Sequence, residues 1–121
     1  MLNAVVSAMR VAFARYSPKI GEVIQNARVE RLRKNKDGST AKKPEVWHMC
    51  AQCKELCKTY DIDHREPVVE IGKTYRDYTF DEYFQRLNCD ISNLQLLCTK
   101  CHDEKTIIEK NLRQEEKKKC L

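Results

Sequence analysis

The chain of 121 residues is poor in aromatic side chains and has no long apolar run. Phe, Trp and Tyr make up only 7% of the residues, so we expect a modest hydrophobic core that needs additional stabilisation. No apolar stretch approaches the roughly 18 residues that a membrane-spanning helix requires. The first ten residues, MLNAVVSAMR, contain no basic segment ahead of the apolar ones, so we expect neither a signal peptide nor a membrane span.

The cysteine count also excludes a class of protein, because seven is an odd number. A secreted disulfide scaffold usually has an even number of cysteines and a signal peptide. A cytoplasmic protein with a metal site and spare thiols fits this composition better. The cysteines that we expect to be spare are Cys57, Cys89 and Cys120.

The other four cysteines form two Cys-x-x-Cys pairs, Cys50–Cys53 and Cys98–Cys101. Four thiolates in this pattern are typical of a tetrahedral structural zinc site, with Zn–S distances of about 2.3 Å. The pairs are separated by 44 residues, which is more than the roughly 15–20 of simple zinc ribbons, so a folded insertion is expected between them. Two alternatives are four buried thiols without a metal, and Cys57 as a rival ligand.

Three side chains beside the cysteine pairs suit chemistry better than structural zinc binding. Asp63 and His64 follow the first pair, and His102 comes directly after the second. Carboxylate oxygens and imidazole nitrogens bind divalent ions such as Mg²⁺, Mn²⁺ and Ni²⁺, and a neutral histidine can take a proton from water near neutral pH. A divalent ion can also stabilise charge on phosphate oxygens. Together these residues predict a phosphodiester hydrolase.

The adjacency of Asp63 and His64 raises a geometric difficulty, because neighbours in a regular strand point to opposite faces. Both can serve one site only where the strand ends or bulges, and Pro67 favours such an ending. Asp61 would share a face with Asp63 and is the weaker alternative ligand. Each candidate also has a purely structural explanation, as a surface histidine, a turn cap or, for His102, a helix cap.

Hydrophobic spacing and capping signals predict a mixture of helices and short strands. Ser17-Pro18 separates two amphipathic helices, and Thr79-x-x-Glu82 is a capping box. We expect helices over residues 5–16, 18–27, 80–87 and from 99 to the tail, and strands over 46–49, 60–64 and 94–97. In the last helix we expect Ile107, Ile108 and Leu112 to pack inward, Glu109 to pair with Arg113, and residues 115–119 to fray.

The net charge of +5 is concentrated in one segment. Residues 28–43 carry seven basic and two acidic side chains, so the remainder of the chain has no net charge. We predict that this basic arm neutralises DNA phosphates without reading sequence, the alternative being a solvated loop. The arm residues predicted to contact nucleic acid are Arg31, Arg33, Lys34 and Lys36.

Residues 46–109 resemble the HNH endonuclease family of phages and bacteria. The resemblance rests on a combined pattern that neither cysteine pair would provide alone. Its parts are Cys50-x-x-Cys53, then Asp63-His64-Arg-Glu-Pro67, then Asn93-Leu-Gln-Leu-Leu-Cys98-x-x-Cys101-His102, followed by Lys105-Thr106.

The resemblance implies an α+β fold. Residues 46–121 would form a small ββα-metal domain, in which two strands and a helix surround one catalytic cation and a four-cysteine zinc site staples the outside. Residues 1–45 would form a helical and basic arm that the family pattern does not cover.

The resemblance also assigns roles to residues. His64 would be the general base, and Asn93 would brace the loop between the two strands by hydrogen bonds. His102 and Asp63 would bind the catalytic Mg²⁺, Mn²⁺ or Ni²⁺, and the four paired cysteines would hold Zn²⁺. Lys105 lies one turn after His102 and could contact a phosphate, although a solvated lysine is an equal alternative.

The function that this predicts is a metal-dependent DNA endonuclease that leaves 5′-phosphate and 3′-hydroxyl ends. A single active site predicts nicking. The alternatives are a non-catalytic zinc module that binds nucleic acid or protein, and an accessory nuclease that works beside the terminase or portal of a phage packaging machine. The N-terminal helices could form a homodimer or pack on their own domain, and a phage-encoded protein would lie in the host cytoplasm.

Overall fold

The computed structural model describes residues 2–119, so the predicted spare thiol of Cys120 lies outside the described residues. The described chain is a mixture of helices and small antiparallel sheets, which confirms the broad α+β prediction. Its elements, in chain order, are α1 (Leu2–Tyr16), α2 (Pro18–Ala27), β1 (Arg28–Arg31), β2 (Glu45–Met49), β3 (Leu56–Cys57), β4 (Tyr60–His64), α3 (Phe80–Leu87), β5 (Leu94–Cys98) and α4 (Thr99–Lys119), with short 3₁₀ turns at Tyr75–Asp77 and Ile91–Asn93.

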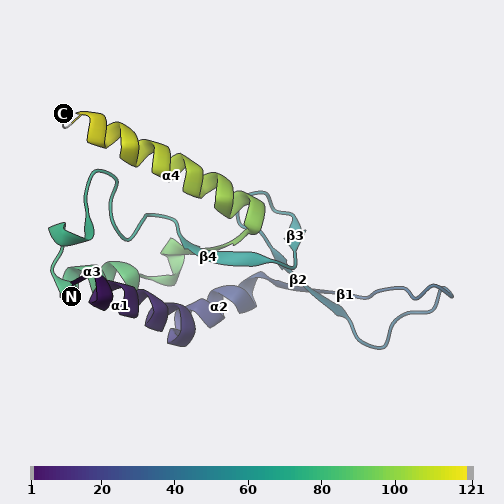
Figure 1. Ribbon diagram of the computed structural model, residues 1–121. Coiled ribbons are helices and arrows are strands. Elements are labelled where there is room, and N and C mark those ends of the chain that lie inside the picture. Colours follow the sequence, from purple (N-terminus) through teal and green to yellow (C-terminus); the bar gives the residue numbers. More distant parts are fainter. Residues whose placement is uncertain (1, 120–121) are drawn as a thin grey trace.

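The strands form two antiparallel sheets, one in the order β1-β2-β3 and one that pairs β4 with β5. The long helix α4 packs across β4 and β5, and α2 packs against the same strand pair from the other side (Figure 1). Alternation divides the β4–β5 pair into an α4 face with Asp63 opposite Gln95, and an α2 face with His64 opposite Leu94. The strand pair is therefore covered on both faces by helices from opposite ends of the chain.

The N-terminal helices pack on the chain's own strands. As predicted, the chain breaks at Ser17 and restarts with Pro18 at the beginning of α2. Val23 of α2 is buried against Leu94 and Leu96 of β5. The sheet and α2 therefore share one core, whereas dimerisation through these helices remains a prediction.

Thr79 caps α3 as predicted, but only the half of the predicted capping box that involves its side chain and the Glu82 N–H is observed. The Thr79 hydroxyl oxygen accepts a hydrogen bond from the backbone N–H of Glu82 at 3.1 Å, and the Thr79 hydroxyl donates to the Glu82 carboxylate. This satisfies a backbone donor that the helix itself leaves free. Tyr83 and Leu87 of α3 are buried with Val68, in a second core that α1 covers.

The prediction for the inward face of α4 was wrong. Ile107 and Ile108 are each 59% exposed and Leu112 is 43% exposed. A helix presents positions i, i+3 and i+7 on one side, and the side turned to β4 carries the polar residues His102, Lys105 and Glu109. Lys105, Glu109 and Arg113 are only partly exposed. The polar side of α4, and not its apolar side, therefore packs toward the strands.

The predicted pair of Glu109 with Arg113 was also wrong. Glu109 accepts a hydrogen bond from Lys105 instead. Arg113 donates to the backbone carbonyl oxygen of Val69 at 2.6 Å and to that of Glu70 at 3.3 Å. Residues 115–119, predicted to fray, belong to α4, which continues to Lys119.

Among the described residues, no helix combines the length and the apolar character needed to cross a membrane.

Candidate functional site

The four paired cysteines converge on one point. Cys50 and Cys53 lie in the loop after β2, Cys98 ends β5, and Cys101 lies in the first turn of α4. All four sulfur atoms lie within 4.8 Å of one another, and the Cys53 and Cys98 sulfurs are 3.9 Å apart. A zinc tetrahedron with Zn–S bonds of about 2.3 Å has S–S edges of about 3.8 Å. The cluster could therefore hold a metal ion such as zinc.

Backbone hydrogen bonds shape the first half of this cluster. The N–H of Lys54 donates to the carbonyl oxygen of Cys50 at 3.0 Å, and Lys54 adopts a left-handed conformation with φ of 62°. The N–H of Ala51 donates to the carbonyl oxygen of Leu96 at 2.9 Å, which ties this turn to the edge of β5. Cys50 and Cys101 are 0% and 4% exposed, so the cluster is also part of a core.

The thiols of the cluster do not ionise alike. Burial opposes ionisation of Cys50, but hydrogen bonds from the backbone at Cys98, Cys53 and Gln52 lower its pKa to about 6. Interaction with the Cys98 side chain, together with burial, raises the pKa of Cys101 to about 12. One thiolate therefore forms readily and further ones repel it, so four thiolates require a cation between them.

Cys57, the rival ligand, is not part of the cluster. Its thiol donates to the backbone carbonyl oxygen of His48 at 3.3 Å, and burial raises its pKa. Within residues 2–119, the four paired cysteines are the one set of three or more His, Cys, Asp or Glu side chains placed to share a metal ion.

A cleft of about 450 Å³ lies between β4 and α4 and contains all three predicted reactive residues. Asp63 and His64 line it from the end of β4, His102 lines it from the start of α4, and Arg10 lines it from α1. Side chains that are far apart in the sequence thus meet in one concave site, which is typical of ligand-binding and active sites.

The strand geometry of Asp63 and His64 is regular, so the two side chains leave β4 on opposite faces. Asp63 faces α4 and accepts a hydrogen bond from the Gln95 side-chain amide at 3.0 Å. His64 faces α1, where its ring lies 5.5 Å from that of Phe13. Both still border the same cleft, because His64 is the last residue of the strand.

One hydrogen bond fixes the protonation pattern of His64. Its Nε2 atom lies 2.8 Å from the backbone carbonyl oxygen of Leu87 at the end of α3. A carbonyl oxygen only accepts hydrogen bonds, so Nε2 carries the proton and donates it. In the neutral ring, Nδ1 is then the nitrogen with a free lone pair.

The predicted metal ligands Asp63 and His102 share the cleft but have different nearest partners. His102 Nδ1 lies 3.6 Å from Asp61 Oδ2, so the alternative carboxylate of the sequence analysis is the one beside the imidazole. Lys105 Nζ lies 3.0 Å from Asp63 Oδ2 and also contacts Glu109. A lysine ammonium thus stands where a cation on Asp63 was predicted.

Lys105 itself is tied into the cleft. Its Nζ donates to the backbone carbonyl oxygen of His64 at 3.0 Å, and its side chain is only 20% exposed. Burial opposes its charge, but the hydrogen bonds and negative charges of Glu109 and Asp63 outweigh burial and raise the pKa of Lys105. A phosphate contact by this residue, as predicted, requires it to leave or share these partners.

Asn93 links the two ends of the segment between β4 and β5. Its Oδ1 accepts from the N–H of Glu66 at 2.9 Å, and its backbone carbonyl oxygen accepts from the N–H of Arg65 at 2.7 Å. These bonds hold the chain directly after His64, and so they hold the rim of the cleft.

Three residues of the site were not found from the sequence. Gln95 could have been identified only from the strand register, which sets it opposite Asp63. Glu109 lies seven residues after His102, a helical spacing that carries a usable signal. Arg10 had no signal, because its place over β4 depends on how α1 packs.

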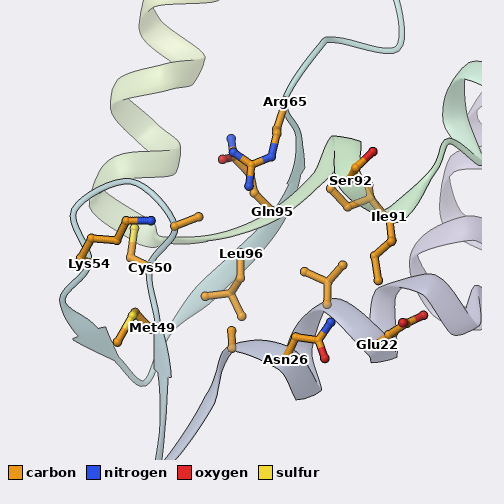
Figure 2. Close-up of a pocket in the computed structure, with 14 residues that line it drawn as sticks. Glu22, Asn26, Met49, Cys50, Lys54, Arg65, Ile91, Ser92, Gln95 and Leu96 are labelled. Atoms are coloured by element: carbon orange, nitrogen blue, oxygen red, sulfur yellow. The ribbon is translucent and has the colours of Figure 1, made fainter.

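A separate pocket of about 380 Å³ lies beside the first cysteine pair. Figure 2 shows Arg65 and Gln95 at one end of it and Lys54 close to Cys50 at another. His64 and His102 do not border this pocket, so the candidate chemistry belongs to the cleft between β4 and α4.

Comparisons of the chain with family models, with curated proteins and with solved structures give no match.

Proposed function

We propose that this protein is a metal-dependent DNA endonuclease of the HNH type. The observation that carries the proposal is the hydrogen bond from His64 Nε2 to the Leu87 carbonyl oxygen. It leaves Nδ1 as the ring nitrogen that can act as a base, and His64 borders the cleft that Asp63 and His102 also line. A histidine held in this way can accept a proton from water near neutral pH.

The proposed reaction needs a divalent cation in the cleft, where one carboxylate and one imidazole are the candidate ligands. Asp63 and His102 would hold it, and an ion such as Mg²⁺ commonly takes only one or two protein carboxylates together with water and substrate phosphate. The ammonium of Lys105 lies 3.0 Å from Asp63 Oδ2, so the cation would have to replace it there. When bound, the cation would stabilise negative charge on the phosphate oxygens.

The chain's own residues would carry the proton transfer. Nδ1 of His64 accepts a proton from a water molecule, and the resulting hydroxide attacks phosphorus in line with the departing 3′ oxygen. The Leu87 carbonyl oxygen continues to accept from Nε2, which stabilises the imidazolium that forms. The 3′ oxygen takes its proton from solvent, and the imidazolium returns its own to solvent.

Charge on the phosphate calls for a further cation, and Arg10 lies in the right place. It lines the cleft from α1, and within the described residues no carboxylate lies within 4.0 Å of its guanidinium. A guanidinium binds phosphate oxygens through two parallel hydrogen bonds. We assign Arg10 to the substrate phosphate.

The proposed four-cysteine zinc site would act on folding and not on chemistry. It joins the turn after β2 to the end of β5 and the start of α4. His102 follows Cys101 directly, so the metal would fix the helix turn that presents this imidazole. Structural zinc contributes folding free energy in small domains.

A duplex oligonucleotide with a label on each strand tests the proposal. Incubation with zinc-loaded protein and Mn²⁺ should yield internal cuts whose 3′ ends a DNA polymerase extends without prior treatment. Cuts that resist extension would contradict a 3′-hydroxyl product. Binding of the duplex with no cut under Mg²⁺, Mn²⁺ or Ni²⁺ would favour the second candidate, a non-catalytic zinc module.

The second candidate has one observation in its favour, which is the ion pair of Lys105 with Asp63. A permanent pair would exclude a cation from the carboxylate. In the nuclease, by contrast, the cation must displace the ammonium, and this competition can be measured.

Replacing Lys105 with glutamine is expected to lower the Mn²⁺ concentration that gives half-maximal nicking by about fivefold, because a competing ion pair of about 1 kcal/mol is removed. The measurement is a Mn²⁺ titration of the nicking rate. Lys110→Gln serves as the matched control, since Lys110 is exposed on the same helix. A half-maximal concentration that is unchanged or higher in Lys105→Gln would show that the ammonium does not compete.

A further inference from the structure

The basic segment of the chain forms a two-stranded ribbon that continues well past the ends of β1 and β2. Figure 1 shows it extending away from the body of the molecule. Beyond Arg31 the two sides of the ribbon pair again, through a bridge between Lys34 and Thr40. Backbone hydrogen bonds join Asn35 to Ser39 and Ala41 to Arg33, each at 2.7 Å.

The two paired sections are out of step by two residues. Arg31 lies opposite Glu45, whereas Arg33 is bonded to Ala41, so one residue on the first strand faces three on the second. Leu32 is the single residue on the first strand, and Lys42, Lys43 and Pro44 are the three that face it, two more than a regular ladder would place there. A bulge of this kind bends a ribbon and leaves its residues outside the ladder, so both lysines are displayed at the bend.

The basic side chains of the ribbon are largely free of acidic partners. The carboxylate of Asp37 at the tip accepts two hydrogen bonds from Ser39 in its own turn. Glu45 lies 3.6 Å from Arg33. Among the described residues, no carboxylate lies within 4.0 Å of the other basic side chains of the segment from 31 to 43, which are Arg31, Lys34, Lys36, Lys42 and Lys43.

We propose that this ribbon, residues 28–49, binds duplex DNA by entering its major groove, with the basic side chains on the flanking phosphates. The inference rests on the proposed function for the identity of the substrate as DNA. The major groove of B-form DNA, about 12 Å wide and about 8.5 Å deep, admits a two-stranded ribbon. The six residue-to-residue steps from Arg31 to Asp37 span about 20 Å at strand spacing, which exceeds the depth of the groove.

The ribbon lacks what a single-stranded partner requires. Proteins that bind single strands stack the bases on exposed aromatic rings. The one Phe, Tyr or Trp of residues 28–49 is Trp47, whose ring lies under the ammonium of Lys58 at 4.7 Å. Its indole N–H donates to Glu45. Basic charge without a stacking surface fits a duplex.

The same geometry separates DNA from RNA. The major groove of an A-form RNA helix is deep and too narrow for protein side chains to read. A ribbon that enters a major groove should therefore prefer duplex DNA to duplex RNA of the same sequence, whereas charge alone would favour neither.

The test compares the zinc-loaded His64→Gln protein, in which cutting should be strongly slowed, with the same protein carrying Lys34→Gln, Lys36→Gln, Lys42→Gln and Lys43→Gln. Fluorescence anisotropy would measure binding to a duplex DNA, its single strand and the matching duplex RNA over a salt series. The control replaces four exposed lysines outside the ribbon, Lys100, Lys110, Lys117 and Lys118, with glutamine. Both sets remove the same charge, and zinc content and thermal unfolding should match in all three proteins.

The ribbon variant is expected to bind duplex DNA roughly 100-fold more weakly near 0.1 M salt, and its log–log salt slope should fall by about 3 to 4. The control should stay within about threefold of the parent protein. The parent should bind duplex DNA about tenfold more tightly than the single strand or the RNA, since only B-form DNA offers the groove. Equal losses in both variants, or equal parent affinities for the three nucleic acids, would overturn the proposal.

The outcome separates this inference from the proposed function. If the wild-type protein nicks DNA and the ribbon variant binds duplex as the control does, the ribbon assignment fails and the nuclease stands. If the wild-type protein never nicks but the ribbon variant alone loses duplex binding, the nuclease fails and the ribbon assignment stands.

Discussion

Replacing His64 with glutamine should lower the rate of plasmid nicking by about 10² to 10⁴-fold, the usual contribution of a general base. The glutamine amide can still donate to the Leu87 carbonyl oxygen, which His64 Nε2 contacts at 2.8 Å. It offers no nitrogen that accepts a proton near neutral pH. The rate would be measured at saturating Mn²⁺, with zinc content and thermal unfolding recorded in parallel.

A second histidine provides the control for this prediction. His48 is buried on β2, with its ring 4.5 Å from that of Tyr60. His48→Gln should lower the unfolding temperature but retain most of the nicking rate below that temperature. A His64→Gln protein that nicks within threefold of the wild-type rate, while folded, would contradict the assignment of the base.

The second large effect concerns the cysteine cluster. Cys98→Ser should release the zinc ion and abolish cooperative thermal unfolding, because a structural zinc site contributes about 10 to 16 kcal/mol in small zinc-dependent domains. That range equals or exceeds the 5 to 15 kcal/mol by which most native proteins are stable. Metal analysis of the purified protein and a circular-dichroism melt would measure both effects.

Cys57→Ser makes the same chemical change outside the cluster. Its hydroxyl can replace the thiol as donor to the His48 carbonyl oxygen. We expect this variant to retain its zinc and a cooperative melt close to that of the wild type. A folded, zinc-free Cys98→Ser protein would contradict the structural role of the cluster, and zinc loss in Cys57→Ser would restore Cys57 as a ligand.

Local signals in the sequence were sufficient for the secondary structure around the site. The strand Tyr60–His64 was predicted with its observed bounds, because it ends shortly before Pro67. The helix Phe80–Leu87 followed from the Thr79 cap. The two Cys-x-x-Cys pairs predicted a four-cysteine cluster, since thiols at this spacing have few other uses, and the four sulfurs do converge.

Features that depend on tertiary packing were not accessible in the same way. Apolar residues were assumed to face inward on α4, but Ile107 and Ile108 are exposed, because the polar stripe of the helix is turned toward β4. The hydrogen bond from His64 to the Leu87 carbonyl oxygen could not be predicted from the sequence, since a backbone carbonyl is present in any residue at the end of α3. The Lys105–Asp63 pair requires knowledge of how α4 crosses the strand.

The ribbon shows a further limit of sequence patterns. Residues 32–44 are mostly polar, and their few apolar residues, Leu32, Ala41 and Pro44, do not alternate with the polar ones in the way that marks a strand. Their pairing comes from the Asp37-Gly38 turn and from backbone hydrogen bonds. Composition predicted the charge of this segment, whereas only the structure gave its form.

The nicking of supercoiled plasmid by zinc-loaded wild-type protein tests the nuclease assignment most directly. Reactions should contain Mg²⁺, Mn²⁺ or Ni²⁺, and the blank should omit the cation without a chelator, which would also strip the cysteine cluster. We predict open circles with at least one cation, none in the blank, and resealing of the nicks by DNA ligase through their 5′-phosphate and 3′-hydroxyl ends. A folded, zinc-loaded protein that binds the plasmid and leaves it supercoiled with all three cations would contradict the assignment.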